Sequence, residues 1–215
     1  MTESPSAQLP TGESMAAAVA LTAEPGEATS ATTGQDAAPQ RGAGPFLHVF
    51  AILLALAGGL LGIIAAFFQE LAGGGGLLLP FVGAPIIEEA LKPTGIYLLL
   101  LRWPRALRGR VHTAVLAALA GLSFAVVESL IYVTLYFPEG SDDFVLFRFT
   151  VPLALHVSAS FLVGLGLDRG ALDWAAGRAR FPKRTRNFYV AGVLVHAVYN
   201  TLAVILTLTG VLDID

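Results

Sequence analysis

The sequence predicts an all-α, polytopic protein of the cell membrane with about five transmembrane helices. Of its 215 residues, 55% are hydrophobic and only 13% are charged, and the mean hydropathy is +0.70. Such a chain is far more apolar than a typical soluble domain. The apolar residues also gather in five runs of 23 to 25 residues. Because a helix needs about 20 residues to cross a bilayer core of roughly 30 Å, each run is long enough to span the membrane.

The five runs and the segment before them divide the chain into two parts. The expected helices cover residues 46–68, 77–101, 113–137, 144–167 and 187–210. Residues 1–44 are rich in Ala, Gly, Pro, Ser, Thr and Glu and contain no aromatic residue. That composition predicts a disordered tail, since it offers too little apolar surface to form a core. Residues 45–215 then form one membrane domain.

The basic residues predict the orientation of the chain in the bilayer. Ten of the 13 Lys and Arg residues fall in two loops, four in residues 102–112 and six in residues 168–186. The loop "PEGSDD", after the third run, carries only acidic charges. Because short loops rich in Lys and Arg stay in the cytoplasm, both basic loops indicate a cytoplasmic N-terminus and an external C-terminus. The absence of cysteine excludes disulfide and thiolate chemistry.

Polar side chains interrupt four of the five apolar runs. They are Glu88, Glu89 and Lys92 in the second run, Glu128 in the third, His156 in the fourth, and His196 and Asn200 in the fifth. Counted from the cytoplasmic loops at 1.5 Å per residue, these groups lie at roughly 14 to 24 Å, which is one layer near the bilayer middle. Ionisable groups at that depth are costly, face the bundle interior and indicate a functional site by default. The sequence therefore predicts one polar cluster inside the bundle.

The segment "APIIEEALKP" makes the burial of its carboxylates tolerable. Lys92 follows Glu88 by four residues, so the two side chains share a helix face. We expect Lys92 to pair with Glu88 or Glu89 and to lower the cost of burying either one. Pro93 cannot donate a hydrogen bond to the carbonyl of Glu89. It therefore predicts a kink, which is tolerated where backbone lines a cavity or is covered by protein.

Two kinds of hydrolytic chemistry are open to this cluster. A glutamate in a dry site can serve as the general base that activates water. His196 and Asn200, one helical turn apart, can then donate together to a developing oxyanion. Alternatively, Glu88, Glu128, His156 and His196 offer the oxygen and nitrogen ligands that suit zinc. Composition and depth leave both chemistries open.

Two other classes of protein use similar residues. Proton-coupled transporters place Glu, His and Lys at the bilayer midplane, and a structural membrane scaffold can hold a buried polar network. In the scaffold interpretation Glu128 is a structural partner of Lys92, and His156 makes an interhelical hydrogen bond. No paired inverted halves are visible among the five runs, which disfavours a transporter. The similar depth of the groups favours a convergent site over a path along the membrane normal.

Four short motifs resemble those of a known family. They are "EEALK" (Glu88 to Lys92), "FAVVE" (Phe124 to Glu128), "RFTVPLALH" (Arg148 to His156) and "HAVYN" (His196 to Asn200). Their order and spacing resemble the PrsW family of intramembrane proteases over roughly residues 77–205. The related CAAX prenyl-protease and bacteriocin-processing family carries EExxxR and FxxxH instead. Here the arginine position is Pro93 and the histidine position is Glu128, so that family fits less well.

The resemblance implies that residues 45–215 hydrolyse a peptide bond in a membrane-anchored protein, such as an anti-sigma factor. Carried onto the motifs, Glu88 or its competitor Glu89 activates water, and Glu128 shares the water or binds an ion. His196 and Asn200 stabilise the oxyanion. Two further residues support the site, Lys92 by setting the charge and His156 by orienting a substrate or a carboxylate.

The expected cofactor and partners follow from the same motifs. The chain contains no HExxH motif, which excludes a zincin-type site. We favour a metal-free glutamate mechanism with no cofactor, while the glutamate at FxxxE keeps a zinc-dependent version open. The expected partners are the protein substrate and the lipid bilayer. No nucleic-acid partner is expected, and the sequence carries no signal for oligomeric state.

Overall fold

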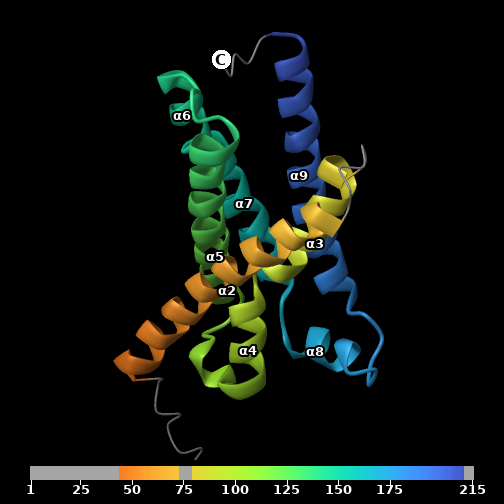
Figure 1. The fold of residues 1–215 in the computed structure, drawn as a ribbon. Helices are drawn as coiled ribbons and strands as arrows, with labels where there is room; N and C mark the ends of the chain where they lie inside the picture. Colours follow the sequence, from red (N-terminus) through yellow and green to blue (C-terminus); the bar gives the residue numbers. More distant parts are fainter. Residues whose placement is uncertain (1–43, 73–78, 211–215) are drawn as a thin grey trace, which may run out of the picture. The chain divides into compact units, whose positions relative to one another are not determined.

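The computed structural model describes residues 44–72 and 79–210, which form helices and no strand (Figure 1). The predicted disordered tail, residues 1–44, lies outside the described residues apart from Gly44. The helices are α2 (Pro45–Ala72), η1 (Leu79–Gly83), α3 (Ala84–Leu91), α4 (Thr94–Arg102), η2 (Pro104–Ala106), α5 (Arg110–Ile131), η3 (Tyr132–Tyr136), α6 (Asp142–Arg148), α7 (Val151–Gly166), α8 (Arg169–Ala175) and α9 (Lys183–Leu208). The all-α, polytopic class predicted from the sequence is confirmed.

Four helical stretches among the described residues are long and apolar enough to cross a membrane. They cover Pro45–Phe68, Arg110–Tyr136, Asp142–Gly166 and Lys183–Leu208. The remaining expected span, residues 77–101, is not one continuous helix, because α3 ends at Leu91 and α4 begins at Thr94. The protein is thus a multi-pass membrane protein whose second expected helix is divided. Its predicted orientation stays a prediction.

Pro93 accounts for the division between α3 and α4. It has no backbone N–H to continue α3, whose last turn closes with a 2.9 Å bond from the Lys92 nitrogen to the Glu88 carbonyl. The Pro93 carbonyl then begins α4 by accepting from the nitrogens of Ile96 and Tyr97 at 2.8 and 3.0 Å. The kink expected at Pro93 is therefore a break, and the carboxylates lie just before it.

A second interruption divides the stretch Asp142–Gly166, between α6 and α7. α6 begins at Asp142, where the Ser141 side chain accepts from the nitrogen of Phe144, and it ends at Arg148. α7 restarts at Val151, with a proline in its first turn. The Ser129 hydroxyl of α5 donates to the Arg148 carbonyl at 2.8 Å. The end of α6 is therefore fastened to α5, and the Arg148 side chain is held beside the bundle interior.

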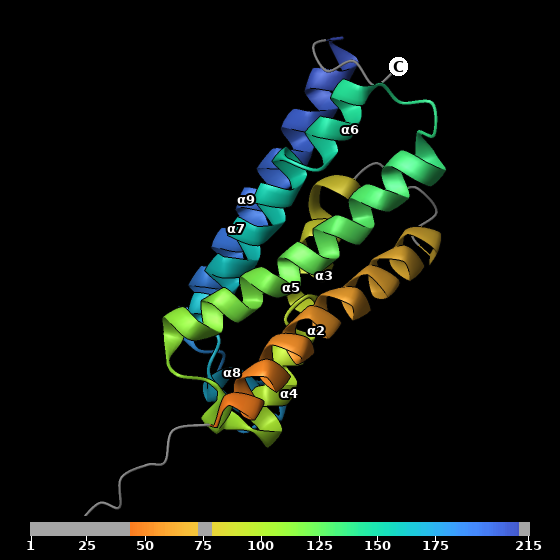
Figure 2. The ribbon, with the colours of Figure 1, turned by 90° about the vertical axis from the view of Figure 1, so that its left-hand side faces the viewer.

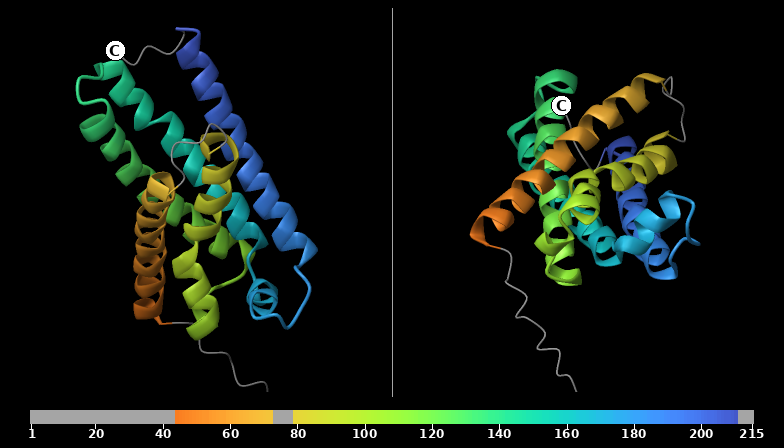
Figure 3. Two further views of the ribbon diagram at one scale, coloured as in Figure 1. Left: turned by 45° about the vertical axis from the view of Figure 1, so that its right-hand side comes forward. Right: turned by 90° about the horizontal axis from the view of Figure 1, so that it is seen from below.

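The long helices α2, α5, α7 and α9 pack around the two short helices α3 and α4. α5 packs against α7 on one side and α2 on the other, and α9 packs on α7 and α3 (Figures 1 and 2). Figure 3 shows α3 and α4 lying between α2 and α9. The residues before and after the Pro93 break are therefore enclosed by neighbouring helices, which makes an interrupted helix tolerable at membrane depth.

Two glycines allow the backbones around the break to touch. A Cβ atom added to Gly95 of α4 would lie 1.8 Å from the carbonyl oxygen of Leu54 in α2. A Cβ added to Gly121 of α5 would lie 2.4 Å from the carbonyl oxygen of His156 in α7. Small residues at such positions are what lets transmembrane helices approach closely. They fix α4 against α2, and the His156 turn of α7 against α5.

Candidate functional site

Six ionisable side chains from four helices and the α3–α4 break meet in one cluster. They are Glu88 and Glu89 of α3, Lys92 at its end, Glu128 of α5, His156 of α7 and His196 of α9. All are buried except Glu128, whose side chain is 20% exposed. The structure thus brings together every ionisable side chain that the sequence placed in the polar layer. Asn200 lies one turn beyond His196 on α9 and is half-buried.

Glu89 is the most completely hydrogen-bonded carboxylate of the cluster. Its Oε1 lies 2.7 Å from Lys92 Nζ and 3.0 Å from His196 Nδ1. Its Oε2 accepts from the Ser160 hydroxyl at 3.3 Å. Both oxygens are therefore occupied, and Glu89 acts as a fixed anion that orients its neighbours.

Lys92 lies at the centre of the cluster. Besides Glu89, its Nζ contacts Glu88 Oε2 at 3.2 Å and His156 Nδ1 at 2.8 Å. The Phe124 ring covers it, with Nζ 4.2 Å from the ring centroid. Lys92 therefore pairs with both glutamates of its motif, where the sequence predicted at least one. A fully buried ammonium with three polar neighbours and an aromatic face is compensated for its loss of water.

A second chain of contacts links His156 to α6. His156 Nε2 lies 3.1 Å from Glu128 Oε2, and the same oxygen accepts from Arg148 NH2 at 3.0 Å. The Arg148 guanidinium also stacks on Tyr132, with Cζ 3.8 Å from the ring centroid. The scaffold interpretation made Glu128 a partner of Lys92, but the ion pairs that Glu128 forms here go to His156 and Arg148.

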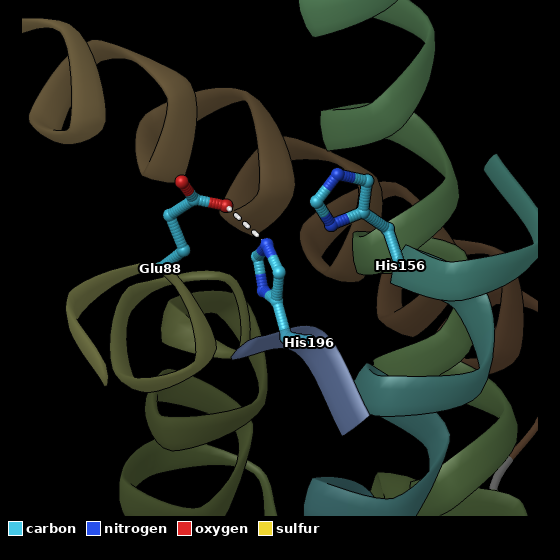
Figure 4. A group of neighbouring side chains, drawn as sticks. All are labelled: Glu88, His156 and His196. Atoms are coloured by element: carbon cyan, nitrogen blue, oxygen red, sulfur yellow. Dashed lines mark ion pairs between the residues drawn. The ribbon is translucent and has the colours of Figure 1, made fainter. Parts of the chain in front are cut away.

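Glu88 and His196 face each other across the cluster (Figure 4). Because the Glu89 carboxylate can only accept, the Nδ1 atom of His196 carries the ring proton and Nε2 keeps its lone pair. That Nε2 atom lies 3.8 Å from Glu88 Oε2, which is buried and forms no hydrogen bond. Two acceptors at this separation suit a water or a cation that contacts both of them.

The donor set also fits a divalent metal ion. One ligand atom from each of Glu88, His156 and His196 lies within 4.8 Å of the others, and all three residues are buried. The carboxylate of Glu89 fixes the His196 ring through Nδ1, as carboxylates commonly do behind metal-binding histidines. Mixed nitrogen and oxygen ligands of this kind suit zinc. Glu128, the fourth metal candidate from the sequence, uses Oε2 for His156 and Arg148 instead.

Two residues of the network were missing from the site predicted by sequence. Ser160 follows His156 by four residues, so helical spacing alone could have placed it on the same face. Arg148 opens the motif that ends at His156, but the sequence predicted no role for it. The break between α6 and α7 brings it to Glu128, and no sequence rule gives that contact.

Comparison with known proteins agrees with the four motifs. The family model described as PrsW family intramembrane metalloprotease matches residues 44–213. No curated protein and no solved structure gives a significant match. The family's description as a metalloprotease does not favour the metal-free mechanism preferred from the sequence. The match covers most of the chain and includes every residue of the buried cluster, so this protein belongs to the PrsW family of intramembrane metalloproteases.

Proposed function

We propose that the protein cleaves a membrane-anchored protein, such as an anti-sigma factor, with Glu88 at the reacting centre. One observation carries the proposal. Glu88 Oε2 is buried, forms no hydrogen bond and faces the lone pair of His196 Nε2 at 3.8 Å. This oxygen is ion-paired with Lys92 but still has an acceptor position open inside the cluster, as a reacting group requires. Family membership supports peptide-bond hydrolysis as the reaction.

The contacts of the two adjacent glutamates support Glu88 over Glu89 as the group that activates water. Both Glu89 oxygens already accept hydrogen bonds, from Lys92, His196 and Ser160. Three of the roughly four acceptor positions of this carboxylate are therefore in use, which leaves Glu89 less open to water than Glu88. Glu88 Oε2 accepts no hydrogen bond and lies 3.2 Å from Lys92 Nζ and 3.8 Å from His196 Nε2. Glu89 is then the residue that orients His196.

The proposed reaction moves one proton across the gap between Glu88 and His196. Glu88 takes a proton from water as the water oxygen attacks the scissile carbonyl carbon. His196 Nε2 receives that proton and gives it to the departing amine as the C–N bond breaks. Once protonated, His196 can also donate to the oxyanion together with Asn200, one turn away on α9. Glu89 stabilises the charged ring through its 3.0 Å contact with Nδ1.

The metal-dependent version uses the same centre with different roles. Glu88, His156 and His196 would hold the ion, because their ligand atoms converge. When bound, a divalent ion supplies Lewis-acid polarisation of the scissile carbonyl. Glu128 then anchors His156 through Nε2, and Arg148 anchors Glu128. Both versions make Glu88 indispensable, and chelation separates them.

Comparing protein N-termini in membranes tests the proposal. Cells would express wild-type protein, Glu88→Gln, or Glu139→Gln, which makes the same change at an exposed loop residue. We expect new N-termini with wild type and Glu139→Gln, and none with Glu88→Gln at equal protein levels. The same termini with Glu88→Gln would remove Glu88 from the reaction. No new termini with any form would favour the transporter or scaffold interpretation.

A further inference from the structure

A cation of the chain itself lies against two of the groups that a metal would use. Lys92 Nζ is 2.8 Å from His156 Nδ1 and 3.2 Å from Glu88 Oε2. His156 and Glu88 are two of the three residues whose ligand atoms converge. The Lys92 side chain is completely buried, and the Phe124 ring lies 4.2 Å from Nζ. This ammonium is therefore held among the ligands and does not extend toward the surface.

The hydrogen bonds of His156 identify the atom for which Lys92 competes. An ammonium has donors only, so His156 Nδ1 accepts from Lys92 and the ring proton is on Nε2. Nε2 then donates to Glu128 Oε2 at 3.1 Å, and Arg148 fastens that oxygen from the other side. The lone pair with which neutral His156 would bind a metal is thus on Nδ1, where Lys92 is already bound.

We propose that Lys92 and a divalent metal ion exclude each other at this site, so that Lys92 sets its metal affinity. The ammonium must leave His156 Nδ1 before an ion can bind that atom, and its ion pair with Glu88 must weaken at the same time. Two cations a few ångströms apart in a dry interior also repel each other strongly. Glu89, whose Oε1 is 2.7 Å from Nζ, remains as the partner of the displaced lysine. This inference rests on the metal-dependent version of the proposed function.

Lys92 stabilises the cluster when no metal ion is bound. Three carboxylates meet in the cluster, from Glu88, Glu89 and Glu128, and buried carboxylates without a cation are strongly destabilising. Lys92 compensates the first two while no metal is present. The same contacts lower metal affinity, since they must be broken or weakened before the ion enters. Lys92 is thus a positioning residue for Glu88 and His156.

Zinc affinity measured without substrate tests the exclusion. Purified wild-type protein, Lys92→Met and Lys183→Met would be titrated with zinc in detergent against a fluorescent zinc chelator. Lys183 is the only other lysine of the chain and is exposed, so it is a matched control. We expect Lys92→Met to bind zinc at least about tenfold more tightly than wild type, because the repelling charge is gone. Lys183→Met should bind as wild type does.

Equal or weaker zinc binding by Lys92→Met would overturn the inference, as would no binding by either form. If Lys92→Met does not fold, the double variant Lys92→Met, Glu89→Gln would be compared with Glu89→Gln alone. The double variant removes both charges of the closest contact, so Glu88 is the one paired acid that loses its lysine without being neutralised. The same increase in affinity is expected, and equal affinities would again overturn the inference.

The assay also separates this inference from the proposed function. Zinc affinity is read without cleavage, so an inactive protein still reports on Lys92. If Lys92→Met and wild type bind zinc equally and cleavage is normal and depends on Glu88, the proposed function stands and only the role of Lys92 is removed. If Lys92→Met binds zinc more tightly but the wild-type protein cleaves nothing, the role of Lys92 stands and the proposed function is removed.

Discussion

Replacing Lys92 by methionine should destabilise the metal-free protein by about 3–5 kcal/mol, the usual cost of removing one partner from a buried ion pair. The short, buried contacts of Lys92 justify this range of destabilisation. Lys92 Nζ lies 2.7 Å from Glu89 Oε1 and 3.2 Å from Glu88 Oε2, and these side chains are 0% and 8% exposed. Glu89 is completely buried, and methionine keeps most of the apolar stem of lysine while removing its charged end and its donors.

Thermal melting in detergent with a chelator present would measure this loss. A change of 1 kcal/mol shifts the melting temperature of a domain of this size by roughly 2–4 °C, so the expected decrease is about 6–20 °C. Lys183→Met, at an exposed position, should melt as wild type does. Adding Glu89→Gln to Lys92→Met should recover part of the loss. Unchanged melting of Lys92→Met would refute the conclusion that this lysine holds the cluster together.

Three further predictions concern packing, positioning and the metal. Gly95→Ala should lower the melting temperature and the cleavage rate, because its Cβ would lie 1.8 Å from a backbone oxygen of α2. Gly44→Ala, whose Cβ would have no atom within 4 Å, should change neither quantity. Equal effects of the two variants would contradict the close approach of α4 and α2. Arg148→Gln should slow cleavage about tenfold or more by releasing Glu128, a loss that Arg186→Gln at the surface should not reproduce. Normal cleavage by Arg148→Gln would show that Glu128 needs no such anchor. A chelator should abolish cleavage, and zinc should restore it, if the metal-dependent version holds; full activity with the chelator would favour the metal-free version.

The spans could be predicted from sequence because a bilayer imposes a length and an apolar composition on each of them. Four expected helices match helical stretches of sufficient length, one of which is interrupted between α6 and α7, and the position of Pro93 located the interruption of the other. The severity of that interruption was underestimated. The missing N–H of Pro93 predicts a kink, but whether α3 and α4 separate depends on the helices around them. Close packing such as that between Gly95 and Leu54 is a tertiary property.

The cluster was predictable as a layer but not as a network. Counting residues placed Glu88, Glu128, His156 and His196 at a similar depth, since helix rise is constant. Which atoms pair depends on the rotation of each helix, and a single sequence does not contain that quantity. The Lys92–His156 contact and the Arg148–Glu128 contact join residues 64 and 20 positions apart. Local spacing could have indicated only the Ser160 position.

Cleavage by Glu88→Gln tests the central claim most directly, once the search for N-termini has identified a substrate. Wild type, Glu88→Gln and Glu139→Gln would be reconstituted in liposomes with that substrate, and each protein would first be melted to establish that it is folded. We predict that Glu88→Gln loses at least about a hundredfold in cleavage rate, while Glu139→Gln keeps the wild-type rate. Wild-type cleavage by folded Glu88→Gln would contradict the assignment of Glu88 to the reacting centre.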